Sequence, residues 1–264
     1  MLTYRDLSTG FKELEIDFHK PIMVHTSLSS FGEIRGGAET LLGALLASFP
    51  TVISPTFTYK TMVIPETGPE NNGIEYGSGR DLNKMAEFFS RDMPADRLMG
   101  TLSEKVRLHP HATRSTHPIL SFAGINAQEA IETQTLNQPF APIQWLAEHQ
   151  GTVLLLGVDH TVNTSIHLAE QLAGRKMFIR WALSSGSILE CPVFPGCSDG
   201  FNQVETELAT ITIPKKIGNA LIKAIPICEM IERLVPMIHK EPEAFLCERA
   251  NCPRCTSVRN ALAG

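Results

Sequence analysis

Several classes of protein are excluded by features that this 264-residue chain lacks. No apolar run approaches the roughly 18 residues needed to span a bilayer, so we expect no membrane partner. The first residues lack the charged-then-apolar order of an export signal, which favours a cytoplasmic protein. There is no basic excess, since 23 Lys and Arg stand against 28 Asp and Glu, for a net charge of −5. Because phosphate neutralisation needs a basic face, nucleic acid is not an expected partner.

The composition also argues against disorder and against a repeat protein. Apolar residues make up 43% and charged residues 19%, as in globular proteins. We find neither an internal repeat nor a low-complexity linker. The length suits one large α/β domain, so we expect a single domain over residues 1–264 with a cysteine-rich tail at about 245–264. The sequence does not determine the oligomeric state, and a homodimer stays open.

Short apolar runs alternate with segments of helical periodicity along the chain. Buried strands are predicted at residues 22–24, 52–55, 119–123, 151–158 and 209–213. Helices are predicted at residues 38–49, 98–107, 128–132, 145–149, 163–173 and 217–225. Residues 61–80 are expected to form a long surface loop and residues 109–115 an irregular linker. The alternation predicts a layered α/β/α sandwich around a mixed sheet, with the strand order undetermined.

The strongest candidate for a functional site follows the strand at 151–158. Polar residues fill the turn after it, and the next helix carries His167 and Glu170. Residues three apart share a face of a helix, and ligands of open α/β sheets bind at the carboxyl ends of the strands. A carboxylate beside an imidazole fixes its tautomer, which suits a general base near neutral pH. Taken alone, the pair also fits a core histidine next to a solvated surface carboxylate.

Two other regions carry groups that suit phosphate. A hydroxyl-rich loop follows the strand at 22–24, and Gly36-Gly37 precedes the next helix. The glycine spacings match neither a P-loop nor a dinucleotide fingerprint, and a serine-rich helix cap is the alternative. Arginines further along offer planar guanidinium groups, although two surface arginines carry little information alone. The residues concerned are Thr26, Ser27, Leu28, Ser29, Arg107, Arg114 and Ser115.

Six cysteines are present, and without an export signal we expect reduced thiols rather than a disulfide framework. Cys247, Cys252 and Cys255 lie close together in the sequence, and Cys197 is a candidate fourth ligand. Four thiolates would form a closed, tetrahedral, structural zinc site, for which the two-residue spacing is typical. The alternative is a set of reduced surface thiols on a tail. A catalytic metal is not expected, since four thiolates leave no open position.

Together these motifs resemble the aminoglycoside 3-N-acetyltransferase family. The matching segments are His25-Thr26-Ser27-Leu28 with Gly36-Gly37, Pro55-Thr56-Phe57-Thr58, Arg114-Ser115-Thr116-His117-Pro118, and Asn163-Thr164-Ser165-Ile166-His167-Leu168-Ala169-Glu170. Their order and spacing are similar over about residues 15–225, and the last segment is highly specific. The resemblance implies an α/β sandwich distinct from the small GCN5-related acetyltransferase fold, with acetyl-coenzyme A as co-substrate.

The resemblance also implies roles for individual residues. His167 corresponds to the general base, and Glu170 to the carboxylate that orients it and binds the amine. The coenzyme A side would be formed by the loop from Thr26 to Ser29 with Arg107 and the Arg114-Ser115 segment. The substrate side would include Tyr59, Asp159, Glu170 and Asp199, whose carboxylates would attract a polycationic acceptor.

The implied reaction is acetyl transfer from acetyl-coenzyme A to an amine, with the 3-amino group of a 2-deoxystreptamine aminoglycoside as the expected acceptor and antibiotic resistance as the expected role. Direct transfer in a ternary complex would use His167 to remove the amine proton and a donor of the 26–29 loop to stabilise the oxyanion. Residues 140–145 depart from the family pattern, and the loop after Tyr59 has no obvious aminoglycoside-binding Asp, so another amine is an alternative. A catalytically silent protein that binds coenzyme A or an amine is a further alternative. A hydrolase using a loop serine lacks the nucleophile-elbow pattern.

Overall fold

The computed structural model describes residues 1–263 and is built around a seven-stranded mixed sheet. Its strands, in spatial order, are β4 (Ala112–Arg114), β5 (Phe122–Ile125), β2 (Val52–Pro55), β1 (Ile22–Thr26), β6 (Thr152–Leu156), β10 (Ala220–Pro226) and β9 (Ile213–Ile217). The central strands β2, β1 and β6 run parallel, and the outer strands are antiparallel to their neighbours. Strands covered on both faces read as continuous apolar runs, which explains why the apolar core of β6 was predictable.

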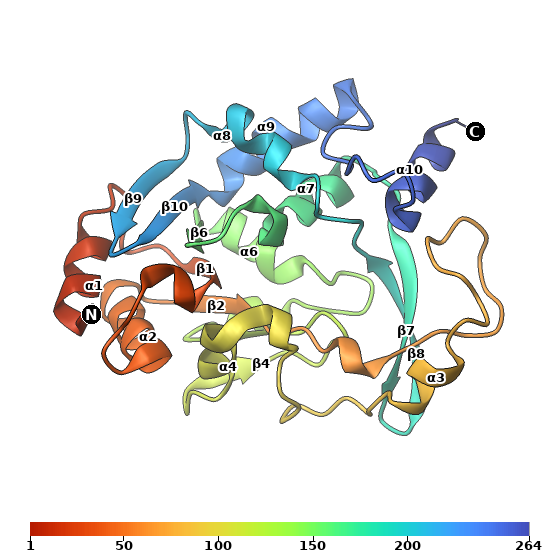
Figure 1. Ribbon diagram of the computed structural model, residues 1–264, viewed down its shortest axis with the longest axis horizontal. Helices are drawn as coiled ribbons and strands as arrows, with labels where there is room; N and C mark the ends of the chain where they lie inside the picture. Colours follow the sequence, from red (N-terminus) through yellow and green to blue (C-terminus); the bar gives the residue numbers. More distant parts are fainter. Residues whose placement is uncertain (264) are drawn as a thin grey trace.

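Helices cover both faces of the sheet (Figure 1). One layer consists of α1 (Tyr4–Lys12), α2 (Gly37–Ser48) and α4 (Gly100–Arg107), and the other of α5 (Gln128–Glu132), α6 (Ala141–Glu148), α7 (Ser165–Leu172) and α9 (Ile227–Lys240). The side chains of β6 divide between the layers: Leu154 and Leu156 join the core under α1 and α2, and Val153 and Leu155 the core under α6 and α9. The predicted α/β/α sandwich is confirmed.

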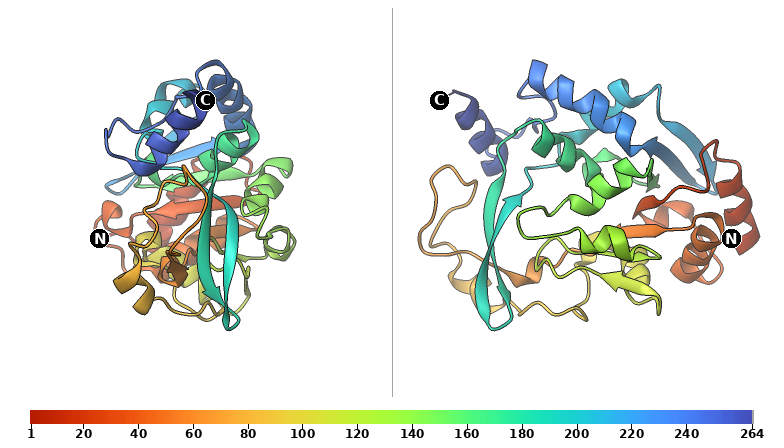
Figure 2. Two further views of the ribbon diagram at one scale, coloured as in Figure 1. Left: turned by 90° about the vertical axis from the view of Figure 1, so that its right-hand side faces the viewer. Right: turned by 180° about the vertical axis from the view of Figure 1, so that it is seen from behind.

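A second, three-stranded sheet lies at the end of the molecule away from α1 and α2 (Figures 1 and 2). It contains β3 (Met62–Val63), β7 (Phe178–Ser184) and β8 (Ser187–Phe194). The remaining helices are α3 (Arg80–Lys84), α8 (Glu205–Leu208) and α10 (Pro253–Ala263), with short 3-10 helices η1 (Leu28–Phe31), η2 (Tyr59–Thr61), η3 (Arg97–Met99), η4 (His160–Val162) and η5 (Phe201–Val204). Within residues 1–263, none of the helices has the length and apolarity required to cross a membrane.

Four of the predicted elements are corrected by the structure. Residues 217–225 were expected to be helical but form the β9–β10 turn and most of β10, where Ala220, Ile222 and Ala224 alternate into the core. Of the strand expected at 209–213, residues 209–211 form a turn after α8, and Ile213 is the first residue of β9. The irregular linker at 109–115 contains β4, and the strand expected at 119–123 begins three residues later. The β7–β8 hairpin and the helices α9 and α10 were not predicted.

Candidate active site

A cleft of about 890 Å³ opens where the parallel strands β1, β2 and β6 end. Its walls come from the segments that follow these strands, residues 26–29, 55–59 and 158–164. The carboxyl ends of parallel strands meet at one edge of a sheet, so the three loops converge there. Residues of the 194–198 segment after β8, and Arg254 from α10, complete the wall.

His167 borders this cleft, and Glu170 lies behind it in the same helix, α7. Nδ1 of the imidazole is 2.7 Å from Oε2 of the carboxylate. The histidine is 8% exposed and the glutamate 1%. Two aromatic rings flank the imidazole, Phe201 with its centroid at 4.8 Å and Phe140 at 6.0 Å. The ring is therefore held in one orientation by a hydrogen bond and by packing.

Glu170 is an ionised carboxylate although it is buried. Burial alone would raise its pKa, but hydrogen bonds and charge attraction from His167 and Arg175 outweigh burial and hold the pKa of Glu170 below its usual value. Nη1 of Arg175 donates to Oε1 of Glu170 at 2.8 Å, and Nη2 donates to the backbone carbonyls of Pro242 and Ala244. Both carboxylate oxygens are thus engaged within the protein. This geometry corrects the expectation that Glu170 itself binds the amine.

The tautomer of His167 follows from the charge of its partner. An ionised carboxylate only accepts hydrogen bonds, so Nδ1 is the donor in this contact, and the neutral form of the imidazole has its lone pair on Nε2. Among the described residues, none donates a hydrogen bond to this Nε2. The imidazole is therefore arranged to take a proton from a group that enters the cleft.

The hydroxyl-rich loop from Thr26 to Ser29 forms another wall. The hydroxyls of Ser27 and Ser29 lie 3.2 Å apart, and η1 begins here, so its first N–H groups have no partner within the helix. Gly157 lets this loop approach β6: its φ is +69°, a Cβ there would lie 2.4 Å from Cβ of Ser30, and the Ser30 hydroxyl donates to its carbonyl at 2.7 Å. The start of α4 at Gly100 borders the same cleft, and helix starts favour anions.

Three residues that were expected to bind coenzyme A do not line the cleft, namely Arg107, Arg114 and Ser115. Arg114 is buried, where burial lowers its pKa to about 10, and it donates to the backbone carbonyls of Thr56, Arg91 and Met93. The hydroxyl of Ser115 accepts from the N–H of Phe122 at 2.9 Å. Arg107 is paired with a neighbouring glutamate of α4 at 2.6 Å. These contacts give the three residues a structural role and correct the expected one.

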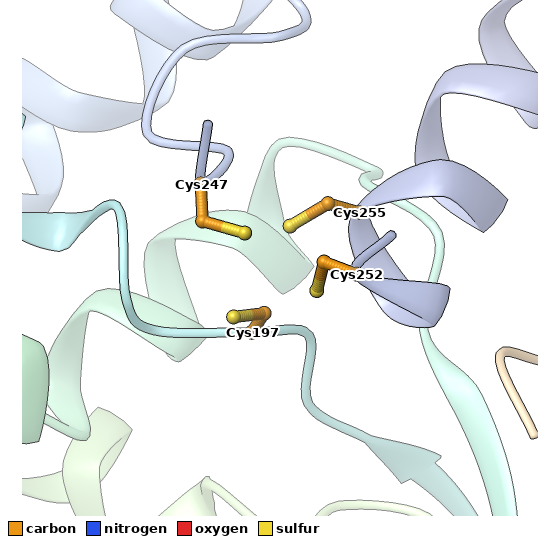
Figure 3. A group of neighbouring side chains, drawn as sticks. All are labelled: Cys197, Cys247, Cys252 and Cys255. Atoms are coloured by element: carbon orange, nitrogen blue, oxygen red, sulfur yellow. The ribbon is translucent and has the colours of Figure 1, made fainter. Parts of the chain in front are cut away.

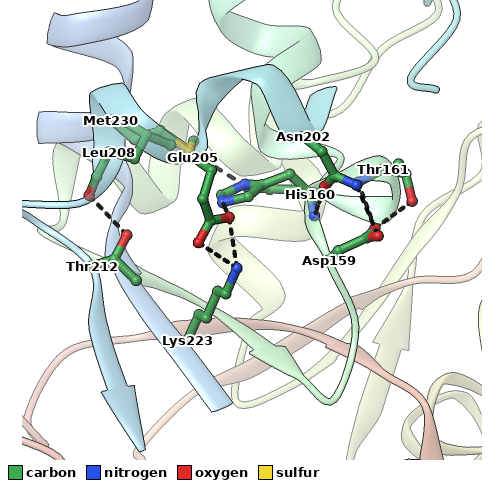
Figure 4. A network of polar contacts seen from close by, with 10 residues as sticks. Asp159, His160, Thr161, Asn202, Glu205, Leu208, Thr212, Lys223 and Met230 are labelled. Atoms are coloured by element: carbon green, nitrogen blue, oxygen red, sulfur yellow. Dashed lines mark hydrogen bonds and ion pairs between the residues drawn. The ribbon is translucent and has the colours of Figure 1, made fainter. Parts of the chain in front are cut away.

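The expected substrate-side residues divide in the same way. Tyr59 borders the cleft, and burial raises its pKa to about 12, so its hydroxyl stays neutral. Asp159 accepts hydrogen bonds from Thr161 and Asn202 (Figure 4). Asp199 is paired with Arg249. Neither aspartate borders the cleft, and among the described residues around it Arg254 alone carries a permanent charge.

The turn before α7 is fixed by the polar network drawn in Figure 4. His160 is fully buried, and its Nε2 lies 3.4 Å from a carboxylate oxygen of Glu205. Glu205 is in turn paired with Lys223 of β10 at 2.6 Å, while Asn202 joins η5 to Asp159. The network connects the turn to α8 and β10, and so sets the position at which the helix carrying His167 begins.

Sequence reasoning missed Arg254 and the 194–198 segment. Nη1 of Arg254 donates to the carbonyl of Gly196 at 2.8 Å, so the start of α10 is joined to the cleft wall. The arginine is separated from its partner by 58 positions, and the adjacent cysteine motif was the sole signal in the sequence for this region. The expected tail of surface thiols is corrected as well, because Cys247, Cys252 and Cys255 are buried.

The fold and the site define a layered α/β protein with an imidazole–carboxylate pair at the carboxyl edge of its sheet. The sequence profile described as aminoglycoside 3-N-acetyltransferase matches residues 23–238, so the chain belongs to this family, as its motifs suggested. It is 29% identical over 180 residues to the SPbeta prophage-derived aminoglycoside N(3')-acetyltransferase-like protein YokD of Bacillus subtilis strain 168. That match covers 64% of each chain, which is less than two thirds of the relative's length.

Solved structures show the same fold. The crystal structure of aminoglycoside acetyltransferase AAC(3)-IVa as apoenzyme superimposes with a TM-score of 0.79 at 22% identity, over 98% of both chains. The structure of AAC-IIIb as a binary complex with CoASH gives a TM-score of 0.73 at 21% identity, over 90% of this chain and 96% of that one. At these identities the likeness establishes the architecture, and residue roles rest on the geometry of this chain.

Proposed function

We propose that the protein is an N-acetyltransferase that moves an acetyl group from acetyl-coenzyme A directly to an amine in a ternary complex. The observation that carries the proposal is His167, which borders the cleft with its Nδ1 bound to a buried carboxylate and its Nε2 unengaged by described residues. Family membership supports the same chemistry.

The residues present supply what this reaction needs. An ammonium ion is not a nucleophile, so the amine must lose a proton before or during attack. The ammonium first loses one proton to solvent, and Nε2 of His167 takes a second proton from the nitrogen as that nitrogen bonds to the thioester carbonyl carbon. As the tetrahedral intermediate collapses, the carbon–sulfur bond breaks and the proton passes to the coenzyme A sulfur. The positive charge that develops on the imidazole of His167 is stabilised by the carboxylate of Glu170, which lies 2.7 Å from Nδ1.

The coenzyme is proposed to lie along the Thr26–Ser29 loop and the start of α4. These segments offer hydroxyls and the backbone N–H groups at the starts of η1 and α4, which suit the phosphates and the oxyanion of the intermediate. The structure of AAC-IIIb in a binary complex with CoASH shares this fold. A hydrolase is disfavoured, because the Ser27 hydroxyl is hydrogen bonded to Ser29 rather than to a histidine.

The proposed acceptor is the 3-amino group of a 2-deoxystreptamine aminoglycoside, as the names of the relatives suggest. One observation favours a second candidate, an amine that also carries an anionic group. Of the residues described around the cleft, none is a carboxylate, whereas Arg254 is cationic. A polycationic acceptor would gain little electrostatic attraction from a cleft lined in this way.

A thiol-release assay with acetyl-coenzyme A tests the proposal and separates the acceptors. We expect release that depends on an added amine, either a 2-deoxystreptamine aminoglycoside or an amine that bears a carboxylate. His167→Ala should lower kcat by about 10²- to 10⁴-fold and leave coenzyme A binding intact. His19→Ala, at an exposed position, is the matched control. Release without any amine, or near-normal turnover in His167→Ala, would contradict the mechanism.

A further inference from the structure

Four of the six cysteines gather at one point on the far side of the loop that walls the cleft. Cys197 follows β8, Cys247 precedes α10, and Cys252 and Cys255 lie at its start. All four are buried, and their sulfur atoms lie within 4.8 Å of one another. Figure 3 shows the four thiols pointing toward a common centre from three separate segments.

This arrangement matches the requirements of a single tetrahedral metal ion. A zinc ion with zinc–sulfur bonds of about 2.3 Å places its four sulfurs about 3.8 Å apart, within the spread observed here. A disulfide would join two of the sulfurs at about 2.05 Å and leave two buried thiols over. Burial of four ionised thiols is unfavourable unless a cation balances their charge.

We propose that Cys197, Cys247, Cys252 and Cys255 bind one structural Zn²⁺ ion. Four buried thiolates that converge on one point are the donor set of structural zinc sites, and four protein ligands leave no position for substrate or water. Neighbouring groups support the site: Nη2 of Arg249 lies 3.7 Å from Sγ of Cys197, and Nη2 of Arg259 donates to the carbonyl of Cys247 at 3.1 Å. Such outer contacts orient ligands and offset the excess negative charge of a four-thiolate site.

The ion would join the segments that complete the cleft. Cys197 is adjacent to Gly196, and Cys255 is adjacent to Arg254, whose guanidinium is bonded to the Gly196 carbonyl. A Cβ at Gly196 would lie 3.8 Å from Oε2 of Glu170, so this loop packs directly on the carboxylate. The zinc site is thus a positioning device for the wall of the cleft and not a catalytic centre.

Metal analysis of the purified protein tests the proposal without any activity measurement. We expect about one zinc per chain in the unmodified protein and in Cys228→Ser, a matched control at an exposed cysteine outside the cluster. Cys252→Ser should lose most of the metal. Replacement of zinc by Co²⁺ should give the intense visible and charge-transfer bands of tetrahedral cobalt thiolate.

A second measurement keeps the test decisive if Cys252→Ser fails to fold. Titration of the unmodified protein with a mercurial reagent, followed by a zinc-sensitive dye, should release one zinc as four thiols react. Absence of zinc, iron in its place, or full metal content in Cys252→Ser would each overturn the proposal. So would reaction of the four cluster thiols without metal release, measured in Cys228→Ser so that the exposed cysteine does not contribute. Failure of the acetyl-transfer assay would not change these readouts, so the two proposals fail separately.

Discussion

Replacing Glu170 by glutamine tests the imidazole–carboxylate pair with almost no change of shape. The carboxylate accepts from two donors, His167 on one oxygen and Arg175 on the other. Glutamine has one oxygen and one NH₂ group, so it cannot accept from both. Arg175 is always charged and can only donate, so it keeps its hydrogen bond to the glutamine oxygen. The glutamine NH₂ group then faces Nδ1 of His167. The imidazole must then accept at Nδ1 and carry its proton at Nε2, where the base is needed.

The size of the effect follows from this switch. Loss of a charge-assisted hydrogen bond, worth about 1.5–3 kcal/mol, lowers the rate about 10- to 150-fold. Loss of the correct tautomer removes general-base catalysis as well, so kcat of Glu170→Gln should fall by about 10²- to 10⁴-fold. The substitution also leaves the buried charge of Arg175 without an opposite charge, which lowers folding stability by up to about 3–5 kcal/mol. The hydrogen bonds of Arg175 to two backbone carbonyls remain and reduce this loss.

Thiol-release kinetics, with thermal unfolding of the same samples, separate the two consequences. Glu129→Gln, at an exposed position of α5, is the control for the substitution itself. The expected result is a large fall in kcat at temperatures where Glu170→Gln is still folded, with the KM for acetyl-coenzyme A little changed. A folded Glu170→Gln protein with kcat within threefold of the unmodified enzyme would refute the reasoning.

Three further predictions concern stability and binding. Burial lowers the pKa of His117 to about 4, so between pH 6.5 and 4 the unfolded chain binds a proton that the folded chain does not. As the pH is lowered through this range, the free energy of unfolding should fall by about 1 kcal/mol per pH unit. In urea melts His117→Asn should show a weaker dependence on pH, and an equal dependence would contradict this account. In the same melts Gly157→Ala should lower the free energy of unfolding by about 2–4 kcal/mol, because its added Cβ would collide with Ser30. Gly186→Ala, where φ is also positive but the Cβ has open space, should lower it by about 1 kcal/mol. Similar losses in the two variants would show that Ser30 moves aside without cost. Arg254→Ala should raise the KM of one substrate by about tenfold and leave the metal bound, whereas unchanged KM values for both substrates would remove Arg254 from the binding wall.

The parts of the molecule that could be predicted are those set by local sequence. The buried cores of the parallel strands are continuous apolar runs, and β2 was placed at its observed bounds. The three-residue spacing of His167 and Glu170 placed both on one face of α7 because that geometry depends on the helix alone.

The parts that could not be predicted depend on distant contacts. In residues 217–225 the apolar positions suit either a helix or a strand, and pairing of β10 with β6 and β9 decides between them. Arg114 has the sequence appearance of a surface residue, yet its guanidinium is enclosed by carbonyls from other segments. No local pattern distinguishes such an arginine from one that binds a ligand.

The C-terminal segment contributes to the cleft although it lies outside the family match, which covers residues 23–238. The carbonyls of Pro242 and Ala244 accept hydrogen bonds from Arg175, which in turn donates to Glu170. In the same segment, Arg254 is the charged residue that lines the cleft. The proposed base His167 and its carboxylate Glu170 lie within the matched residues 23–238, so the proposed chemistry rests on the part of the chain that the family shares. The charged residue of the cleft wall, Arg254, lies in a segment outside the matched residues. We therefore expect exchange of residues 239–263 to change which amines are accepted, while the dependence of turnover on His167 is retained.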